Sequence, residues 1–137
     1  MGVRIEGLDG LLVELDGLVD EGKMKKQVGK AGLVVERAAK QNAAAIKDTG
    51  RLADSIATEV DGLTCTVFTP LEYAPYVEYG TGLYAEKGGR KDVPWHYQDD
   101  EGNWHSTKGQ HPRPFLRPAF DENREKVTRI LEEGLGR

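Results

Sequence analysis

The most informative feature of this 137-residue sequence is what it has little of. Cys65 is the only cysteine, which excludes a disulfide within the chain and any metal site built from cysteines alone. No apolar run approaches the roughly 20 residues that a membrane-spanning helix needs. The first ten residues, MGVRIEGLDG, lack the apolar segment of a secretory signal. We therefore expect one domain over residues 1–137 in a reducing cytoplasm, with no membrane partner.

Catalytic motifs are also scarce. The segment EYGTGLY has two glycines but lacks the Lys-Ser or Lys-Thr pair of a phosphate-binding loop, so it predicts a turn. Cys65 falls within an expected strand, where a small buried side chain is the ordinary case. His96, His105 and His111 share one stretch, but a zinc site would need further ligands. The sequence therefore predicts neither an enzyme nor a site for a metal or cofactor.

Charge is unevenly distributed along the chain, whose net charge is −4. Residues 1–22 and residues 52–83 each carry a net −5, whereas residues 23–51 carry +6 from eight basic and two acidic side chains. Alternating bands suit contacts between copies of one chain, because an acidic surface of one copy can meet a basic surface of another. Lys26 and Lys30, in the basic band, are therefore candidate assembly residues.

Helical periodicity is clear in three regions. Leucines spaced by three and four predict an amphipathic helix over residues 8–18, with Gly22 able to end it. A longer apolar stripe predicts a helix over residues 23–47. A third stripe predicts a C-terminal helix with Pro118 in its first turn. The members of the long stripe are Met24, Val28, Ala31, Val35, Ala38, Ala39, Asn42, Ala45 and Ile46.

A short turn and a hairpin follow the long helix. Thr49 can cap a turn that buries Leu52 and Ile56. Alternation over residues 56–60 and 63–67, around Asp61-Gly62, predicts two antiparallel strands. The fold class is therefore α+β, with a small antiparallel sheet packed against the long helix and the C-terminal helix.

The segment YAPYVEYGTG, residues 73–82, favours one helical turn over a strand, because Pro75 cannot donate a ladder hydrogen bond. Pro75 suits the first helical position and Gly80 the left-handed position after the end. Tyr73, Tyr76 and Tyr79 would then stack at a spacing of three, with their rings on the sheet. Tyr76 and Glu78 are candidate assembly residues within this turn.

Residues 83–111 form what we call the excursion. A four-residue loop at residues 99–102 would place Tyr97 opposite Trp104 and His96 opposite His105. Trp95, Tyr97 and Trp104 would then share one face of a two-stranded ribbon, and such a ribbon is marginal alone in water. We therefore expect an excursion that protrudes and that is either mobile or ordered only by contact with a neighbouring copy.

Four segments in this order resemble one protein family. They are DTGRLADSI (48–56), YAPYVEYGT (73–81), the ribbon with its W…D..G…T.GQ pattern (95–110) and PRPFLRPAF (112–120). Together they resemble the head–tail joining or tail-completion proteins of long-tailed bacteriophages, of the HK-type coliphage gene-ten kind. The resemblance spans about residues 20–135.

The resemblance implies a non-enzymatic virion protein at the neck, assembled in the host cytoplasm, with no cofactor. It implies a homo-oligomeric ring, commonly sixfold, that contacts head-completion and tail-tube proteins. It leaves open whether this chain terminates the tail tube or joins tail to head. The segment PRPFLRPAF would return the chain from the excursion to the core, and its Phe115 and Leu116 are the last assembly candidates.

Two other functions fit parts of the sequence. The basic helix over residues 23–40 could bind phosphates of a nucleic acid, but the chain is acidic and carries no recognition motif, so no specific nucleic acid is expected. A small hydrolase using His96 or His105 is the less favoured alternative.

Overall fold

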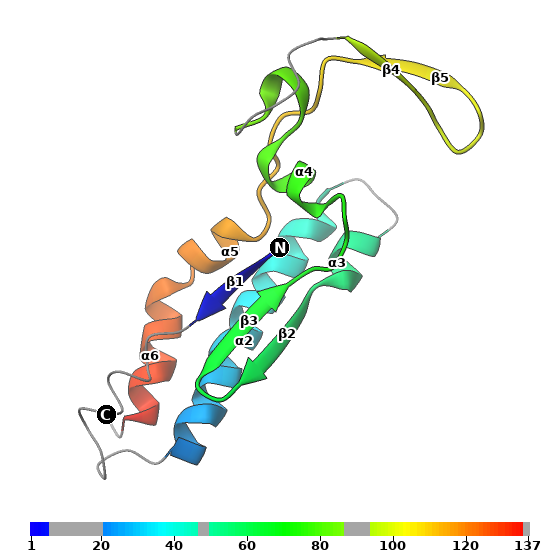
Figure 1. The fold of residues 1–137 in the computed structure, drawn as a ribbon. Helices are drawn as coiled ribbons and strands as arrows, with labels where there is room; N and C mark the ends of the chain where they lie inside the picture. Colours follow the sequence, from blue (N-terminus) through cyan, green and yellow to red (C-terminus); the bar gives the residue numbers. More distant parts are fainter. Residues whose placement is uncertain (6–20, 47–49, 87–93, 136–137) are drawn as a thin grey trace. The chain divides into compact units, whose positions relative to one another are not determined.

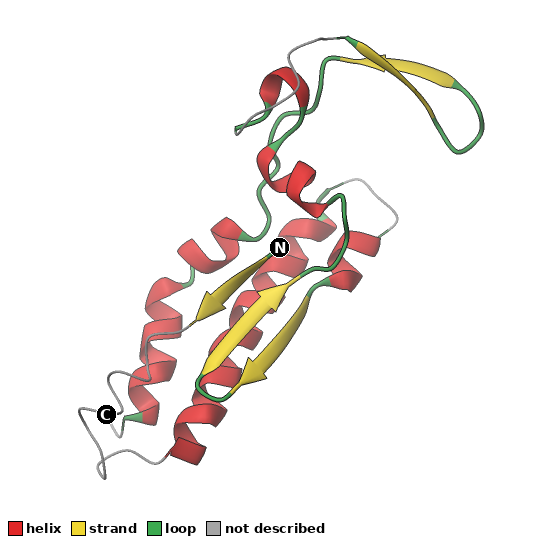
Figure 2. Ribbon diagram, in the orientation of Figure 1, coloured by secondary structure: helices red, strands yellow, loops and turns green. Residues whose placement is uncertain are grey.

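The computed structural model describes residues 1–5, 21–46, 50–86 and 94–135, in an α+β fold with two compact units. Unit 1 comprises residues 1–71 and 115–137, and unit 2 comprises residues 72–114. Figures 1 and 2 show the elements of each unit. The amphipathic helix expected over residues 8–18 lies outside the described residues.

Unit 1 contains a three-stranded antiparallel sheet in the order β1-β3-β2. The strands are β1 (Gly2–Ile5), β2 (Ala57–Asp61) and β3 (Thr64–Phe68). The hairpin of β2 and β3 was predicted, whereas β1 was not, because four residues are too few to establish a period of two. The register pairs Ile5 and Val60 with Cys65, and Val3 and Thr58 with Val67, so these six residues share one face.

The turn between β2 and β3 lies one residue later than the sequence suggested. Asp61 pairs with Thr64, so Gly62 and Leu63 form the turn instead of Asp61 and Gly62. Gly62 has a φ of 59°, a conformation that glycine adopts without steric cost. Asp61 therefore remains in the ladder as the last residue of β2.

The long helix α2 (Glu21–Ala44) packs against the sheet, α3, α5 and α6. It begins earlier than expected, so Gly22 lies in its first turn and does not end a helix. Ala45 is exposed and Ile46 lies beyond the helix end, contrary to the predicted stripe. No helix in the described ranges has the length and hydropathy to span a bilayer. The buried residues of α2 are Met24, Gln27, Val28, Ala31, Gly32, Val35, Ala39 and Ala43.

Helix α3 (Arg51–Ser55) buries Leu52, and Ile56 follows it into the core, as predicted. Its N-cap is Gly50, with a φ of 81°. Thr49, which was expected to cap this turn, lies outside the described residues.

The C-terminal region forms two helices, α5 (Arg117–Asp121) and α6 (Arg124–Gly134), in place of the single predicted helix. The break falls at Asn123, whose Nδ2 donates to the Ala119 carbonyl at 2.8 Å and so offers the backbone an alternative to helical bonding. Buried Gln27 on α2 donates from Nε2 to the Ile130 carbonyl at 2.8 Å, which ties α6 to α2.

Unit 2 contains α4 (Ala74–Tyr79), the 3-10 turn η1 (Gly82–Tyr84) and a two-stranded sheet of β4 (Trp95–Gln98) and β5 (Trp104–Thr107). Helix α4 confirms the single turn predicted for YAPYVEYGTG. Pro75 occupies its second position, one later than expected, and Gly80 follows with a φ of 82°.

Candidate assembly surfaces

The two ends of the excursion are joined by backbone hydrogen bonds, in a segment we call the stem (residues 81–83 and 108–110). Thr81 N donates to the Gln110 carbonyl at 2.9 Å, and Gln110 N donates back to the Thr81 carbonyl at 3.2 Å. Leu83 N donates to the Lys108 carbonyl at 2.9 Å. Just outside the stem, the rings of Tyr84 and His111 stack with centroids 3.9 Å apart. The stem therefore closes the excursion at its base.

Two glycines permit this close approach of the stem backbones. Gly82 has a φ of 63° and Gly109 a φ of 122°. A Cβ at Gly82 would collide with the Lys108 carbonyl, and one at Gly109 with the Thr81 carbonyl. Any larger residue at either position would therefore force the two backbones apart. The contact therefore requires glycine at positions 82 and 109.

The hairpin of β4 and β5 has a register one residue away from the predicted one. Gln98 pairs with Trp104, Tyr97 with His105 and His96 with Ser106. The loop thus has five residues, 99–103, and His96 does not face His105. Because directly paired residues share a face and faces alternate along a strand, Trp104 lies on the opposite face from positions 95 and 97. The single aromatic face predicted for this ribbon is therefore wrong.

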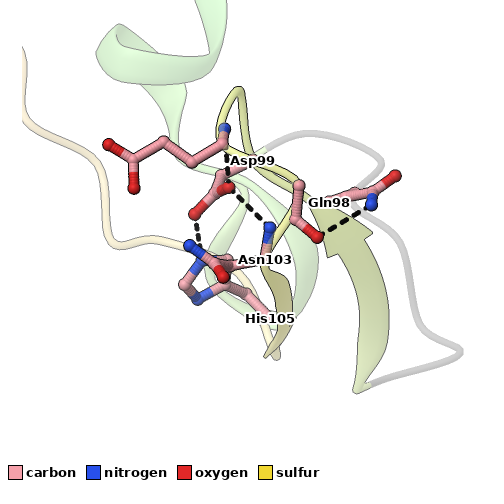
Figure 3. A network of polar contacts seen from close by, with 6 residues as sticks. Gln98, Asp99, Asn103 and His105 are labelled. Atoms are coloured by element: carbon pink, nitrogen blue, oxygen red, sulfur yellow. Dashed lines mark hydrogen bonds and ion pairs between the residues drawn. The ribbon is translucent and has the colours of Figure 1, made fainter.

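The loop length is set by Asp99, as Figure 3 shows. Its Oδ1 accepts hydrogen bonds from Glu101 N at 3.0 Å and Asn103 N at 2.9 Å, and Asp99 N donates to the Asn103 carbonyl at 2.9 Å. Oδ2 lies 2.7 Å from His105 Nε2. The hydrogen bond with His105, followed by that with Asn103 N, lowers the pKa of Asp99. An aspartate at the start of a loop can accept hydrogen bonds from backbone amides further along it. The assumption of a four-residue loop at residues 99–102 did not take this into account.

Few of the described hydrophobic side chains of unit 2 are buried. Among the sixteen described hydrophobic residues that are buried, only Ala74 belongs to unit 2. Four of the six large hydrophobic residues that are described as exposed belong to it, although it is the smaller unit. Exposed aromatic and aliphatic side chains of this kind are candidates for contacts with a partner. These side chains are Tyr76 (60% exposed), Leu83 (54%), Tyr84 (38%) and Trp104 (70%).

A basic stripe runs along α2 in unit 1. Lys26, Lys30, Leu33 and Arg37 follow one another at spacings of four, three and four, and all four are exposed. Leu33 lies in the middle of the stripe with 46% of its surface exposed. Lys26, Lys30 and Arg37 form no ion pair with any other described residue. We call these four residues the basic stripe.

The face of the sheet that points away from α2 is polar, and we call it the outer sheet face. It carries Arg4, Glu59, Asp61, Thr64 and Thr66, which line a hollow of about 460 Å³ together with Gly62 and Leu63 at the turn. Glu59 and Asp61 are exposed on the edge strand β2. No described helix of unit 1 lies over this face, which is toward the viewer in Figure 1.

The structure separates the sequence-predicted assembly residues into exposed and buried ones. The exposed candidates are Lys26, Lys30, Tyr76 and Trp104. For Trp95 and Tyr97 the structure describes only the backbone, which belongs to β4. Three candidates are buried and unavailable at a surface: Glu78 (0% exposed), Phe115 (0%) and Leu116 (1%).

Phe115 and Leu116 belong to the core of unit 1, where the Phe115 carbonyl accepts a hydrogen bond from Asn42 Nδ2 on α2 at 3.0 Å. The structure therefore makes them packing residues of this core, in place of the assembly role expected from the sequence. The tyrosine stack expected in α4 is also incomplete, since Tyr76 is mostly exposed while Tyr73 and Tyr79 are half-buried.

Sequence reasoning missed Leu33 and Val60 as exposed apolar residues beside the charged groups. Leu33 is off the buried stripe of α2 by its spacing, so the helical period could have revealed it. Within the described ranges, no group of three or more histidine, cysteine or acidic residues is arranged to hold a metal ion. Burial raises the pKa of the Cys65 thiol, which disfavours its reactive thiolate form.

Comparison with known proteins gives one match. A family model described as "Bacteriophage HK97-gp10, putative tail-component" matches residues 11–80, half of the chain. The match covers α2, α3, β2, β3 and α4 and ends at Gly80, just before the stem. No curated protein and no solved structure matches the chain.

Proposed function

The chain belongs to the HK97 gp10-like family of bacteriophage tail components, and from this premise we propose that it is a neck protein that acts as a ring of identical copies. In this role it terminates the tail tube or joins the finished tail to the filled head. It works as a structural protein of the virion, with no catalytic step of its own, and it reaches the virion from the host cytoplasm during assembly. Its partners are copies of itself, tail-tube proteins and head-completion proteins.

The exposed apolar side chains of unit 2 carry this proposal. Among the described residues of unit 2, Ala74 is the one buried hydrophobic side chain and Trp104 is 70% exposed, so the described part offers little of the apolar burial that stabilises an independent domain. Its backbone is instead held by the stem and by the Asp99 loop. Such a unit is suited to gain its apolar contacts from a neighbour, as an assembly arm does. Burial of apolar surface contributes about 25 cal/mol per Å², so a contact centred on Trp104 would stabilise the assembled state by several kcal/mol.

The experiment is electron microscopy of particles made with and without the intact gene, combined with a count of this chain in wild-type necks. Several copies around the neck axis are expected. Tubes of abnormal length in the deletion would identify a terminator, whereas normal tails beside filled heads would identify a joining protein. A single copy per particle, or no copy at all, would refute the proposed role.

A further inference from the structure

Unit 1 carries two surfaces of opposite charge whose side chains are described and exposed. The basic stripe presents Lys26, Lys30 and Arg37 over about 16 Å of helix, at 1.5 Å per residue. The outer sheet face presents Glu59 and Asp61 on β2. These surfaces come from the central basic band and from the acidic band that follows it.

The basic stripe differs from an ordinary solvated helix face because Leu33 lies at its centre. A leucine with 46% of its surface exposed adds apolar area that water does not favour. A second exposed aliphatic side chain, Val60 of β2, lies beside α2. Its Cγ2 would be 3.8 Å from a Cβ at Gly29, which is one helical turn before Leu33. Positive charge around an apolar centre is typical of a rimmed protein interface.

The outer sheet face offers complementary charge and a hollow. Its hollow of about 460 Å³ is lined by the two carboxylates and by the hydroxyls of Thr64 and Thr66, all of which can accept hydrogen bonds from lysine. Arg4 lies on the β1 side, across Thr66 from Glu59. The β2 side of the hollow, with Glu59 and Asp61, is therefore where cations would bind.

The two surfaces cannot be one self-complementary patch. The outer sheet face is directed away from α2, because the opposite face, with Cys65 and Thr58, is the one that contacts Gly32 of α2. A contact that joins one surface of a molecule to a different surface of the next is heterologous, and its repetition closes a ring when the rotation fits.

We infer that the basic stripe of one copy docks on the outer sheet face of the next copy, so that Lys26 and Lys30 meet Glu59 and Asp61 around the ring. This inference rests on the proposed function, since it requires several copies side by side in the neck. It assigns the contact between copies to unit 1 and leaves the apolar side chains of unit 2 for other contacts.

The test uses two charge-reversal variants of the full chain, each supplied to a phage that lacks the gene. Lys26→Glu with Lys30→Glu reverses the stripe, and Glu59→Lys with Asp61→Lys reverses the outer sheet face. Each alone should lower the number of copies per particle by about tenfold or more, because like charges then face each other. Lys126→Glu with Arg129→Glu, exposed positions on α6 with the same charge change as the stripe variant, is the matched control and should assemble normally.

Combining the variants shows whether the ion pairs form between two copies or within a single copy. Co-expression of the two reversed chains should restore assembly in alternating rings, because each reversed stripe can dock on a reversed sheet face. The chain with all four reversals should also assemble. Ion pairs within a single chain cannot be restored by co-expression, so failure of both combinations would overturn the inference.

The remaining outcomes are also decisive. Normal assembly of either single-surface variant overturns the inference, and so does a stripe variant that only loses salt-sensitive binding to DNA. Circular dichroism melting of each variant excludes misfolding as the cause. Absence of the wild-type chain from particles would refute the proposed function, whereas wild-type rings with unaffected variants would refute only this contact.

Discussion

Gly32 on α2 lies directly against Cys65 on β3. A Cβ at Gly32 would lie 2.7 Å from Cys65 Sγ and 2.8 Å from Thr58 Cγ2, so the helix approaches the sheet as closely as a glycine allows. Glycine inside a helix ordinarily lowers stability by about 1 kcal/mol relative to alanine. Here the missing side chain allows α2 to pack closely on Cys65 and Thr58 of the sheet.

Gly32→Ala should therefore destabilise the protein, by about 1–3 kcal/mol, because the added methyl group overpacks the contact with Cys65. Gly29→Ala, on the same helix, is the matched control. Its Cβ would meet only Val60 Cγ2 at 3.8 Å, an ordinary contact, so it should raise stability by up to about 1 kcal/mol. Urea unfolding of both variants measures the difference, and equal effects of the two alanines would show that the close approach is not there.

Trp104→Ala should change the free energy of unfolding by less than about 0.5 kcal/mol, because the side chain is 70% exposed in the chain alone. In particles it should reduce the joining of tails to heads, since the residue would lose its contact with a neighbour. Thermal melting and counts of joined particles provide the two readouts. A large loss of stability with normal joining would place Trp104 in the core of its own chain.

Gly82→Ala should disrupt the stem, because its Cβ would collide with the Lys108 carbonyl while φ is 63°. Hydrogen exchange at the amides of Thr81, Leu83 and Gln110 should speed up. Gly102→Ala is the control, since Gly102 also has a positive φ, 86°, but the nearest atom to its Cβ would be Gln98 Nε2 at 3.6 Å. If both variants expose the stem equally, backbone conformation rather than close approach determines its stability.

The loop at Asp99 should depend on pH. Hydrogen bonds from His105 and Asn103 lower the pKa of Asp99 below its usual 3.8. A depressed pKa in the folded loop means that its stabilising contribution is complete above the unfolded pKa and is lost as pH falls through the folded one. Amide chemical shifts of Glu101 and Asn103 should therefore show an acid transition with its midpoint below 3.8.

Asp99→Asn removes the titrating group and should abolish that transition, whereas Asp100→Asn should leave it in place. A transition that persists in the Asp99 variant would assign the pH dependence to another group.

The sequence predicted the α+β class, the helix α2, the hairpin of β2 and β3, and the turn at Pro75, because each rests on a local period or on the geometry of proline and glycine. It failed where the hydrogen bonds of one side chain decided the outcome. The loop at Asp99 has five residues because the carboxylate accepts two backbone amides, and this shift moved Trp104 to the other face. Similarly, Asn123 divides the C-terminal helix.

The candidate surfaces were predictable only in part. Lys26 and Lys30 were found from the basic band of the sequence, and the structure shows both to be exposed. Phe115 and Leu116 look the same in sequence whether they fill a core or an interface, and only their burial assigns them to the core. The outer sheet face depends on the register of three strands, one of which was too short to recognise.

The order in which unit 1 is encoded has a consequence for its synthesis. Its chain is interrupted by the whole of unit 2, and its helix α6 pairs with residues far upstream, as the bond between Gln27 and the Ile130 carbonyl spans 103 residues. A ribosome therefore completes unit 2 before the last segment of unit 1 exists. During that interval the apolar face of α2 lacks its contacts with α5 and α6 and stays exposed to solvent. Contacts between residues so distant along the chain also form slowly. A premature stop codon that removes the last twenty residues would consequently leave unit 2 complete but unit 1 without most of α5 and all of α6.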